Sequence, residues 1–338
     1  MELSPQRTYY SAHSTRERIK KSPRWDNEEG VASTVGTIMA LLVFLTFMGL
    51  FTNQFLPVWM SDNESAHMSQ VIQQFSTLKS QIDASVSNYA NSMVAPSPVF
   101  VPIMLSSPGI PVFAGPTAGI LQLTPEAKKL PSMFNLSYTW TSTIGGVTSS
   151  HVLDTTNDGH AGGDLDLYCP NRYYVEQHLI YEGGAIILNQ TDGEFIIAGP
   201  QFSVTNTGSG GSVNRVVMLT QFTLLGKNNT IAGTGSKGVS ADLLYSGTTV
   251  YENGDGSDLT ITITSKHGNA WGSYFNRTLN STRVGLAWNV DYTINKTLIP
   301  QPDRFQDYYV VVLTIHSVKA LGHTVALISM SIGELGII

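Results

Sequence analysis

The sequence is poor in cysteine and in charge. Cys169 is the only cysteine among 338 residues, so no disulfide can form within the chain. Charged residues make up 13% of the sequence, whereas an average soluble domain has roughly a quarter. The chain is long enough to bury a large core. Without disulfides, a body outside the cytoplasm must depend on that core for its stability.

The common signatures of catalysis and nucleotide binding are missing as well. The sequence contains no G-x-S-x-G, H-E-x-x-H or G-x-x-x-x-G-K-[ST] motif. The segment GTGSKG at 233–238 is rich in glycine but lacks the phosphate-loop spacing, and no base can be paired with Cys169, which we expect to be a buried thiol. A net charge of −6 disfavours nucleic acid as a partner. We therefore expect a protein that is not an enzyme and binds neither nucleotides nor nucleic acid.

One apolar run stands out, from Val31 to Phe51. It contains no charged residue, and its polar residues are small. A helix of about 20 residues, rising about 1.5 Å per residue, spans a hydrocarbon layer of about 30 Å. Phe55 and Trp59 follow where a membrane interface would lie. The sequence predicts a transmembrane helix over 31–56 that binds membrane lipid. A buried core helix and a secretory signal peptide fit the length and the flanks less well.

The charges on either side of this run predict its orientation. Residues 1–24 contain six basic and two acidic side chains, whereas the chain from Val31 onward contains 13 basic and 20 acidic ones. We expect a cytoplasmic basic leader, 1–30, and an extracytoplasmic body, because positive charge stays on the cytoplasmic side. Seven N-x-[ST] sequons beyond the run agree with an outward-facing glycoprotein. These candidate glycosylation sites are Asn63, Asn135, Asn189, Asn228, Asn276, Asn280 and Asn295.

The leader and the run together form a familiar pattern. The stretch RWDNEEGVASTVGTIMALLVFLTFMGLF, residues 24–51, resembles the N-terminus of archaeal type IV pilin-like proteins with class III signal peptides. The resemblance implies processing between Gly30 and Val31 by a membrane-embedded aspartyl peptidase. It also implies that the apolar helices pack into a filament core or remain as anchors. The alternative is an uncleaved anchor that carries an extracytoplasmic binding module or sensor.

A second helical pattern follows, and we expect an amphipathic stalk helix over 61–94. Apolar residues recur every three or four positions along it, which is the spacing of one helix face. Ser61 or Asp62 would cap its start, and the prolines of APSP at 95–98 would end it. Two alternatives remain, because the apolar stripe would pack either on the protein's own β body or on stalks of other subunits. The stripe comprises Met68, Ile72, Phe75, Leu78, Ile82, Val86, Tyr89 and Met93.

The remainder, 97–338, reads as an all-β body. Short runs rich in β-branched and aromatic residues alternate with Gly, Pro, Asn and Asp. We expect an antiparallel β-sandwich with a candidate seam between two lobes at 208–212, where the sequence is GSGGS. The segment YENGDGSDLT at 251–260 predicts a hairpin turn. A single helix is expected in the body, near 269–279.

One polar stretch, SHVLDTTNDGHAGGDLDLYC at 150–169, invites a metal-site hypothesis. Loops rich in carboxylates hold calcium, although the spacing does not match an EF-hand, and Asn, Asp and Gly also form ordinary turns. His151 and His160 with a carboxylate are a weaker zinc hypothesis. We favour a solvated loop, with no cofactor other than this weak calcium site. Its candidate ligands are Asp154, Asp158, His160, Asp164 and Asp166.

These features predict a mainly β protein with a long N-terminal helix, anchored in the cell membrane by a single pass. Its expected function is that of a pilin-like structural or adhesive protein of the cell surface, acting as a minor component of a type IV pilus-like assembly. Its expected partners are membrane lipid and other pilin-like subunits or envelope components.

Overall fold

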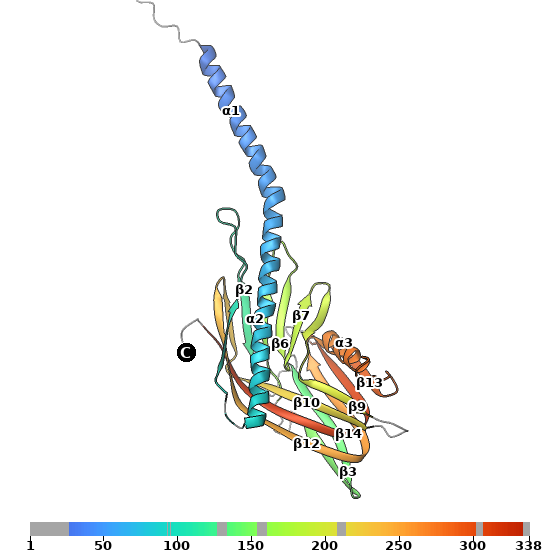
Figure 1. The fold of residues 1–338 in the computed structure, drawn as a ribbon. Coiled ribbons are helices and arrows are strands. Elements are labelled where there is room, and N and C mark those ends of the chain that lie inside the picture. The colour runs from blue at the N-terminus through green and yellow to red at the C-terminus, as the bar shows by residue number, and fades with distance from the viewer. Residues whose placement is uncertain are drawn as a thin grey trace, which may run out of the picture. The chain divides into compact units, whose positions relative to one another are not determined.

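The computed structural model describes residues 27–92, 94, 96–126, 134–153, 161–207, 214–301 and 307–333, apart from the side chains of 27–30 and 91. Strands account for 52% of the described residues and helices for 27%, so the described part of the protein is mainly β with one long N-terminal helix, as predicted. The chain divides into two compact units between Phe55 and Leu56. Figure 1 gives the labels used below.

The first unit is helical wherever it is described. Helix α1 covers Asn27–Leu50 and is followed by a π-helical segment, η1, at Phe51–Phe55. Every residue from Val31 to Phe47 is exposed. The helical stretch that starts at Val31 is the one described segment long and apolar enough to cross a membrane.

The second unit begins with helix α2, Leu56–Ser92. Its start differs from the prediction, because Ser61 and Asp62 lie inside the helix and do not cap it. Pro57 has no N–H to donate to the carbonyl group of Asn53, four residues before it. The π-helical segment η1 at this point accommodates the missing hydrogen bond without ending the helix. At this point the chain therefore changes its helical type locally and remains helical.

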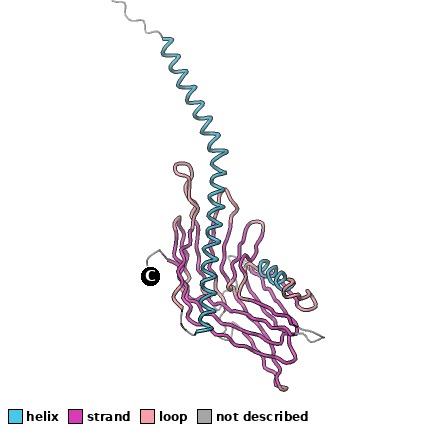
Figure 2. Tube along the Cα trace, viewed as in Figure 1, coloured by secondary structure: helices cyan, strands magenta, loops and turns pink. Residues whose placement is uncertain are grey.

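In the described residues after α2, the chain forms fourteen strands and one further helix. In the 8-stranded sheet the main order is β4-β3-β12-β14-β10-β9, with β1 on β12 and β13 on β14, and the 6-stranded sheet has the order β11-β2-β5-β6-β7-β8. Figure 2 shows these strands in magenta. The elements are β1 (Val99–Met104), β2 (Gly119–Thr124), β3 (Asn135–Ile144), β4 (Val147–Leu153), β5 (Asp164–Cys169), β6 (Gln177–Glu182), β7 (Ala185–Gln190), β8 (Gly193–Ala198), β9 (Phe202–Thr207), β10 (Asn214–Leu225), β11 (Asn229–Gly233), β12 (Ser236–Ser265), α3 (Gly268–Leu279), β13 (Tyr292–Ile299) and β14 (Tyr308–Gly333).

The pairing is mostly, but not entirely, antiparallel. Strand β10 pairs with β14 in parallel, so the 8-stranded sheet is mixed, whereas the prediction was of an antiparallel sandwich. Such a pair needs a long crossover connection, here the chain between Leu225 and Tyr308. The crossover contains β11, β12, α3 and β13.

Two apolar cores fill the body, and the long strands β12 and β14 contribute to both. The first core contains residues of α2, of β1 and of the 6-stranded sheet, together with Val239 of β12 and Ile328 of β14. The second contains residues of β3, α3 and β13, together with Ile261 of β12 and Leu313 of β14. The predicted seam at 208–212 lies outside the described residues.

The prediction of a hairpin turn at 251–260 is wrong. This segment lies inside β12, whose pairing with β14 shifts register between Glu252 and Ser257. The backbone N–H of Asp255 donates to Oδ1 of Asn253 at 3.2 Å, and Gly256 has a φ of 78°, which favours glycine. The turn-forming residues therefore produce a bulge that bends one long strand. Helix α3, by contrast, is confirmed close to its predicted range.

Candidate functional surfaces and polar sites

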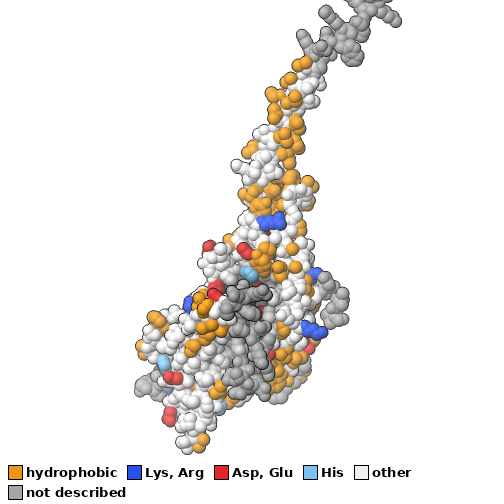
Figure 3. All heavy atoms as spheres, turned by 180° about the vertical axis from the view of Figure 1, so that it is seen from behind, with side chains coloured by type: hydrophobic (Ala, Val, Ile, Leu, Met, Phe, Trp, Pro, Cys, Tyr) orange, Lys and Arg blue, Asp and Glu red, His pale blue; other side chains and the backbone are white. Residues whose placement is uncertain are grey.

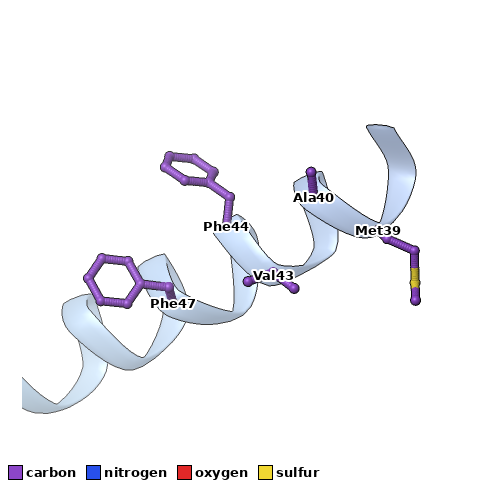
Figure 4. A pocket seen from close by; sticks show the side chains of 5 residues that line it. All are labelled: Met39, Ala40, Val43, Phe44 and Phe47. Atoms are coloured by element: carbon purple, nitrogen blue, oxygen red, sulfur yellow. The ribbon is translucent and has the colours of Figure 1, made fainter. Parts of the chain in front are cut away.

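The apolar surface of α1 is the first candidate functional surface. Large apolar side chains are exposed on all sides of the helix, and Figure 3 shows them gathered along it. Figure 4 shows five residues that line one shallow, open stretch of this surface, namely Met39, Ala40, Val43, Phe44 and Phe47. From Val31 to Leu50 this surface carries no charge, and such an apolar surface is suited to lipid tails or to another apolar helix.

Two threonines of α1 form hydrogen bonds within their own helix. The hydroxyl group of Thr37 donates to the backbone oxygen of Thr34 at 2.8 Å, and that of Thr46 donates to the backbone oxygen of Leu42 at 2.8 Å. These bonds satisfy the hydroxyl groups without water. This matters for an apolar surface, because an unsatisfied polar group in lipid is costly.

The residues of the processing hypothesis, Gly30 and Val31, both lie within α1, which begins at Asn27. The side chain of Val31 is exposed. The peptide bond between them therefore belongs to the helical segment.

Helix α2 uses its apolar stripe differently. Its side chains Phe75, Leu78 and Ile82 are buried in the first core beside Leu121 of β2 and Ile328 of β14. The stripe therefore packs on the protein's own β body, which is the first of the two alternatives. Met93, the last residue of the predicted stripe, lies outside the described residues.

A buried carboxylate joins α2 to the loop between β5 and β6. Glu64 is fully buried, and its oxygens accept the backbone N–H groups of Arg172, Tyr173 and Tyr174 at 3.1, 2.8 and 2.7 Å. Three such bonds compensate for the loss of water around the charge. We call this arrangement the Glu64 clamp. Its partners are more than 100 residues away in sequence, so no local signal could have revealed it.

A second polar cluster lies at the start of α3. Glu182 Oε1 accepts hydrogen bonds from Ser265 Oγ and from Trp271 Nε1, each at 2.6 Å. Glu194 Oε2 lies 2.9 Å from His267 Nδ1. The other oxygen of Glu194, Oε1, accepts the backbone N–H of Asn269 at 2.8 Å, so a carboxylate from β8 caps the first turn of α3.

Burial and charge shift the pKa values in this cluster. Burial raises the pKa of Glu182 and, with the charge of Glu182 opposite it, raises the pKa of Asp164 to about 6. Burial alone would lower the pKa of His267. Its hydrogen bond to Glu194 and the negative charges of Glu182 and Glu194 outweigh that effect and raise it. All three side chains are buried, and each polar contact described here joins structural elements. The cluster is therefore a structural network.

The calcium hypothesis receives little structural support. Asp154, Asp158 and His160 lie outside the described residues. Asp164 is buried on β5 and faces Glu182 across the sheet, while Asp166 lies 3.1 Å from His178 Nδ1. Within the described part of the chain, no group of three or more His, Cys, Asp or Glu side chains is arranged to hold a metal ion.

Two further histidines and the single cysteine occupy packed positions in the β body. His323 is buried between Tyr138 and Gln221, and burial lowers its pKa to about 4. A neutral ring explains both contacts, because Nδ1 accepts from the Tyr138 hydroxyl and Nε2–H donates to Gln221 Oε1. His151 of the zinc hypothesis bonds Ser142 at 2.9 Å through Nε2. Cys169 is a buried free thiol, as predicted, with a pKa raised by burial to about 12.

The seven sequons differ in accessibility. Asn228, Asn280 and Asn295 are exposed, in a loop, at the end of α3 and on β13. Asn276 is exposed too, but its Oδ1 accepts the Tyr292 hydroxyl at 2.7 Å. The remaining three, Asn63, Asn135 and Asn189, are half-buried within a helix or strands.

Comparison of the chain with protein-family models, curated proteins and solved structures found no match.

Proposed function

We propose that this chain is a pilin-like surface protein, anchored or assembled through α1, that presents its β body outside the cytoplasm. The observation that carries the proposal is the contrast along its N-terminal helix. Residues 31–47 are uncharged, mostly apolar and exposed throughout, whereas α2 buries its apolar stripe in the body's own core. An exposed apolar helix is costly in water. It therefore requires lipid or other apolar helices as its surroundings.

The orientation in this proposal follows from charge. The basic leader 1–24 would remain in the cytoplasm, and the acidic body would lie on the other side. The exposed sequons Asn228, Asn280 and Asn295 support an outward-facing body, because an oligosaccharide needs an accessible asparagine. The function would be structural or adhesive, with other pilin-like subunits or envelope components as partners.

A specific observation favours the second candidate, an uncleaved anchor with an extracytoplasmic binding module. The bond between Gly30 and Val31 lies inside a helical segment that begins at Asn27. A peptidase would have to unwind this turn before cutting. In this form, α1 would serve only as a tether.

The two candidates are separated by the N-terminus of the native protein. Mass spectrometry of membrane and sheared-surface fractions would identify it. A chain that begins at Val31 and occurs in sheared fibres supports assembly after processing. A chain that begins at Met1 and occurs only in membranes contradicts assembly and supports the tethered module.

A further inference from the structure

We propose that the loop 108–116, between β1 and β2, is a second membrane-contacting element that inserts its tip into the lipid interface beside the start of α2. The inference rests on the proposed membrane anchoring of α1. It adds a lipid-binding site within the body. The sequence around the loop is uncharged, since no ionisable side chain occurs from 95 to 125.

The tip of this loop is a tight, apolar turn. The N–H of Ile110 donates to the oxygen of Ala114 at 2.8 Å, and the N–H of Ala114 donates back to Ile110 at 2.9 Å, which leaves 111–113 at the tip. Val112 is 100% exposed and Phe113 is 40% exposed. The base is closely packed at Gly109, where an added Cβ would lie 2.4 Å from the backbone oxygen of Ala114.

The backbone of Val112 is strained. Its φ is 74°, in the left-handed region that a β-branched residue seldom occupies. Such strain is found mainly at functional positions. No burial within the chain offsets it at a fully exposed valine. Burial in a lipid interface would offset it.

Hydrogen bonds to α2 fix the direction in which the loop runs. The backbone oxygen of Met104 lies 2.9 Å from His67 Nε2, and that of Pro108 accepts from Asn63 Nδ2 at 3.3 Å. The chain from 104 to 108 thus advances along α2 towards its first turn, by about 6 Å at 1.5 Å per helical residue. Figure 1 shows the loop next to β2 rising beside α2 at the end of the body where that helix begins.

The remaining distance is short enough for the tip to reach the start of α2. Asn63 lies seven residues after Leu56, or about 10 Å along the helix. Four residues from Pro108 to Val112 span up to about 13 Å when extended. This span is long enough for the tip to come level with Leu56, where α2 begins after η1. Val58 and Trp59, which are both exposed, lie on this same first turn of α2.

Lipid is the occupant that these observations favour. A site beside the start of α2 is held close to the bilayer by the chain itself, because the apolar run ends only a few residues before Leu56. An uncharged loop with an apolar tip loses little on leaving water, and aromatic side chains such as Trp59 and Phe113 favour the headgroup region.

The test uses the full chain reconstituted in phosphatidylcholine vesicles, with an environment-sensitive fluorophore on one introduced cysteine. Val112→Cys carries the label at the loop tip. Val147→Cys is the matched control, because Val147 is also an exposed valine beside a tight turn, between β3 and β4. Phe44→Cys reports on α1. The native Cys169 is buried and reacts slowly, and the unsubstituted chain is the blank.

We expect a nitroxide-labelled lipid to quench the label at 112 and the label at 44, while the label at 147 keeps its fluorescence and its water-like emission. Quenching at 44 without quenching at 112 overturns the loop proposal and leaves the anchoring of α1 intact. A label at 112 that is shielded from water but not quenched by lipid also overturns it and indicates a protein partner. If neither 44 nor 112 is quenched, both proposals fail.

Discussion

Helices α1 and α2 are consecutive in the chain but have opposite relations to their surroundings. Phe44 of α1 is 57% exposed, whereas Phe75 of α2 is fully buried beneath the β body. The polar groups differ in the same way. The hydroxyl of Thr46 bonds a carbonyl of its own helix, whereas Glu64 bonds the backbone of a loop in the body.

The difference corresponds to two helical sequence patterns, each suited to a different environment. A helix surrounded by lipid needs apolar side chains on every face and polar groups satisfied within the helix. A helix that packs on a sheet needs one apolar stripe, and its polar side chains can serve as bonds to other elements. The structure assigns the second pattern to α2, and the proposed function assigns the first environment to α1.

The test with the largest expected effect compares two phenylalanines on one continuous helical stretch. Phe75→Ala leaves a cavity in the first core and should lower the free energy of unfolding of the body by about 3–5 kcal/mol. Phe44→Ala removes a side chain outside the body and should leave that value unchanged. Urea unfolding in a non-ionic detergent, followed by near-ultraviolet circular dichroism, measures both. Equal effects of the two substitutions would contradict the comparison.

The second test varies the pH, since α1 and the body should respond differently. The pKa of Asp164 in the folded state is about 6, above its ordinary value near 4, so folding takes up a proton. The contribution of Asp164 to the free energy of unfolding is therefore fully present below pH 4. It is lost as the pH rises through 6, by at most about 3 kcal/mol. His267 changes the stability in the same direction. Its pKa is raised, so protonation of its ring stabilises the fold below pH 6.5, and this contribution decreases at higher pH.

Two buried histidines, His67 and His323, act in the opposite direction, because their lowered pKa values destabilise the fold below pH 6.5. The test therefore compares Asp164→Asn with the native chain, and we expect the change from pH 5 to pH 8 to be less favourable to the melting temperature of the native chain than to that of the variant. Retention in membranes should not change over the same range, because no ionisable side chain occurs between Val31 and Ser61. The same pH dependence of the melting temperature in the native chain and in Asp164→Asn would show that the buried carboxyl group of Asp164 is not protonated as described.

The third test concerns the Glu64 clamp. Glu64→Gln keeps the size of the side chain but removes the charge that three N–H groups share, and it should lower stability by about 1–3 kcal/mol. Asp62→Asn makes the same chemical change at an exposed position two residues earlier and should have little effect. Chemical denaturation of the three proteins gives the comparison. Equal denaturation midpoints for Glu64→Gln and Asp62→Asn would show that the Glu64 clamp does not stabilise the fold.

The smallest expected effect is that of Thr46→Val in α1. The Thr46 hydroxyl already bonds the Leu42 carbonyl of the same helix at 2.8 Å, and valine has nearly the same shape. Membrane retention and the oligomeric state in detergent should both stay as they are in the native chain. A change in oligomeric state would mean that this hydroxyl bonds a neighbouring helix, and α1 would then be more than an apolar surface.

The sequence predicted the features that arise from local patterns. The uncharged run after Val31, the stripe of α2 and the helix near 269–279 were all predicted from local sequence, and the structure contains all three helices. The bulge at Gly256 was misread as a turn, because Asn, Asp and Gly favour both. The parallel pairing of β10 with β14 and the contact of Glu64 with Tyr174 depend on distant segments. No local pattern encodes them.

The most direct test of the account is amide hydrogen exchange of the full chain in lipid nanodiscs, measured at a urea concentration that unfolds the body. The account predicts that peptides of α2 lose their protection together with the β strands, while peptides from Val31 to Leu50 remain protected by lipid. Rapid exchange in α1, or loss of protection in both helices at the same urea concentration, would contradict the claim that the two helices are stabilised by different solvents.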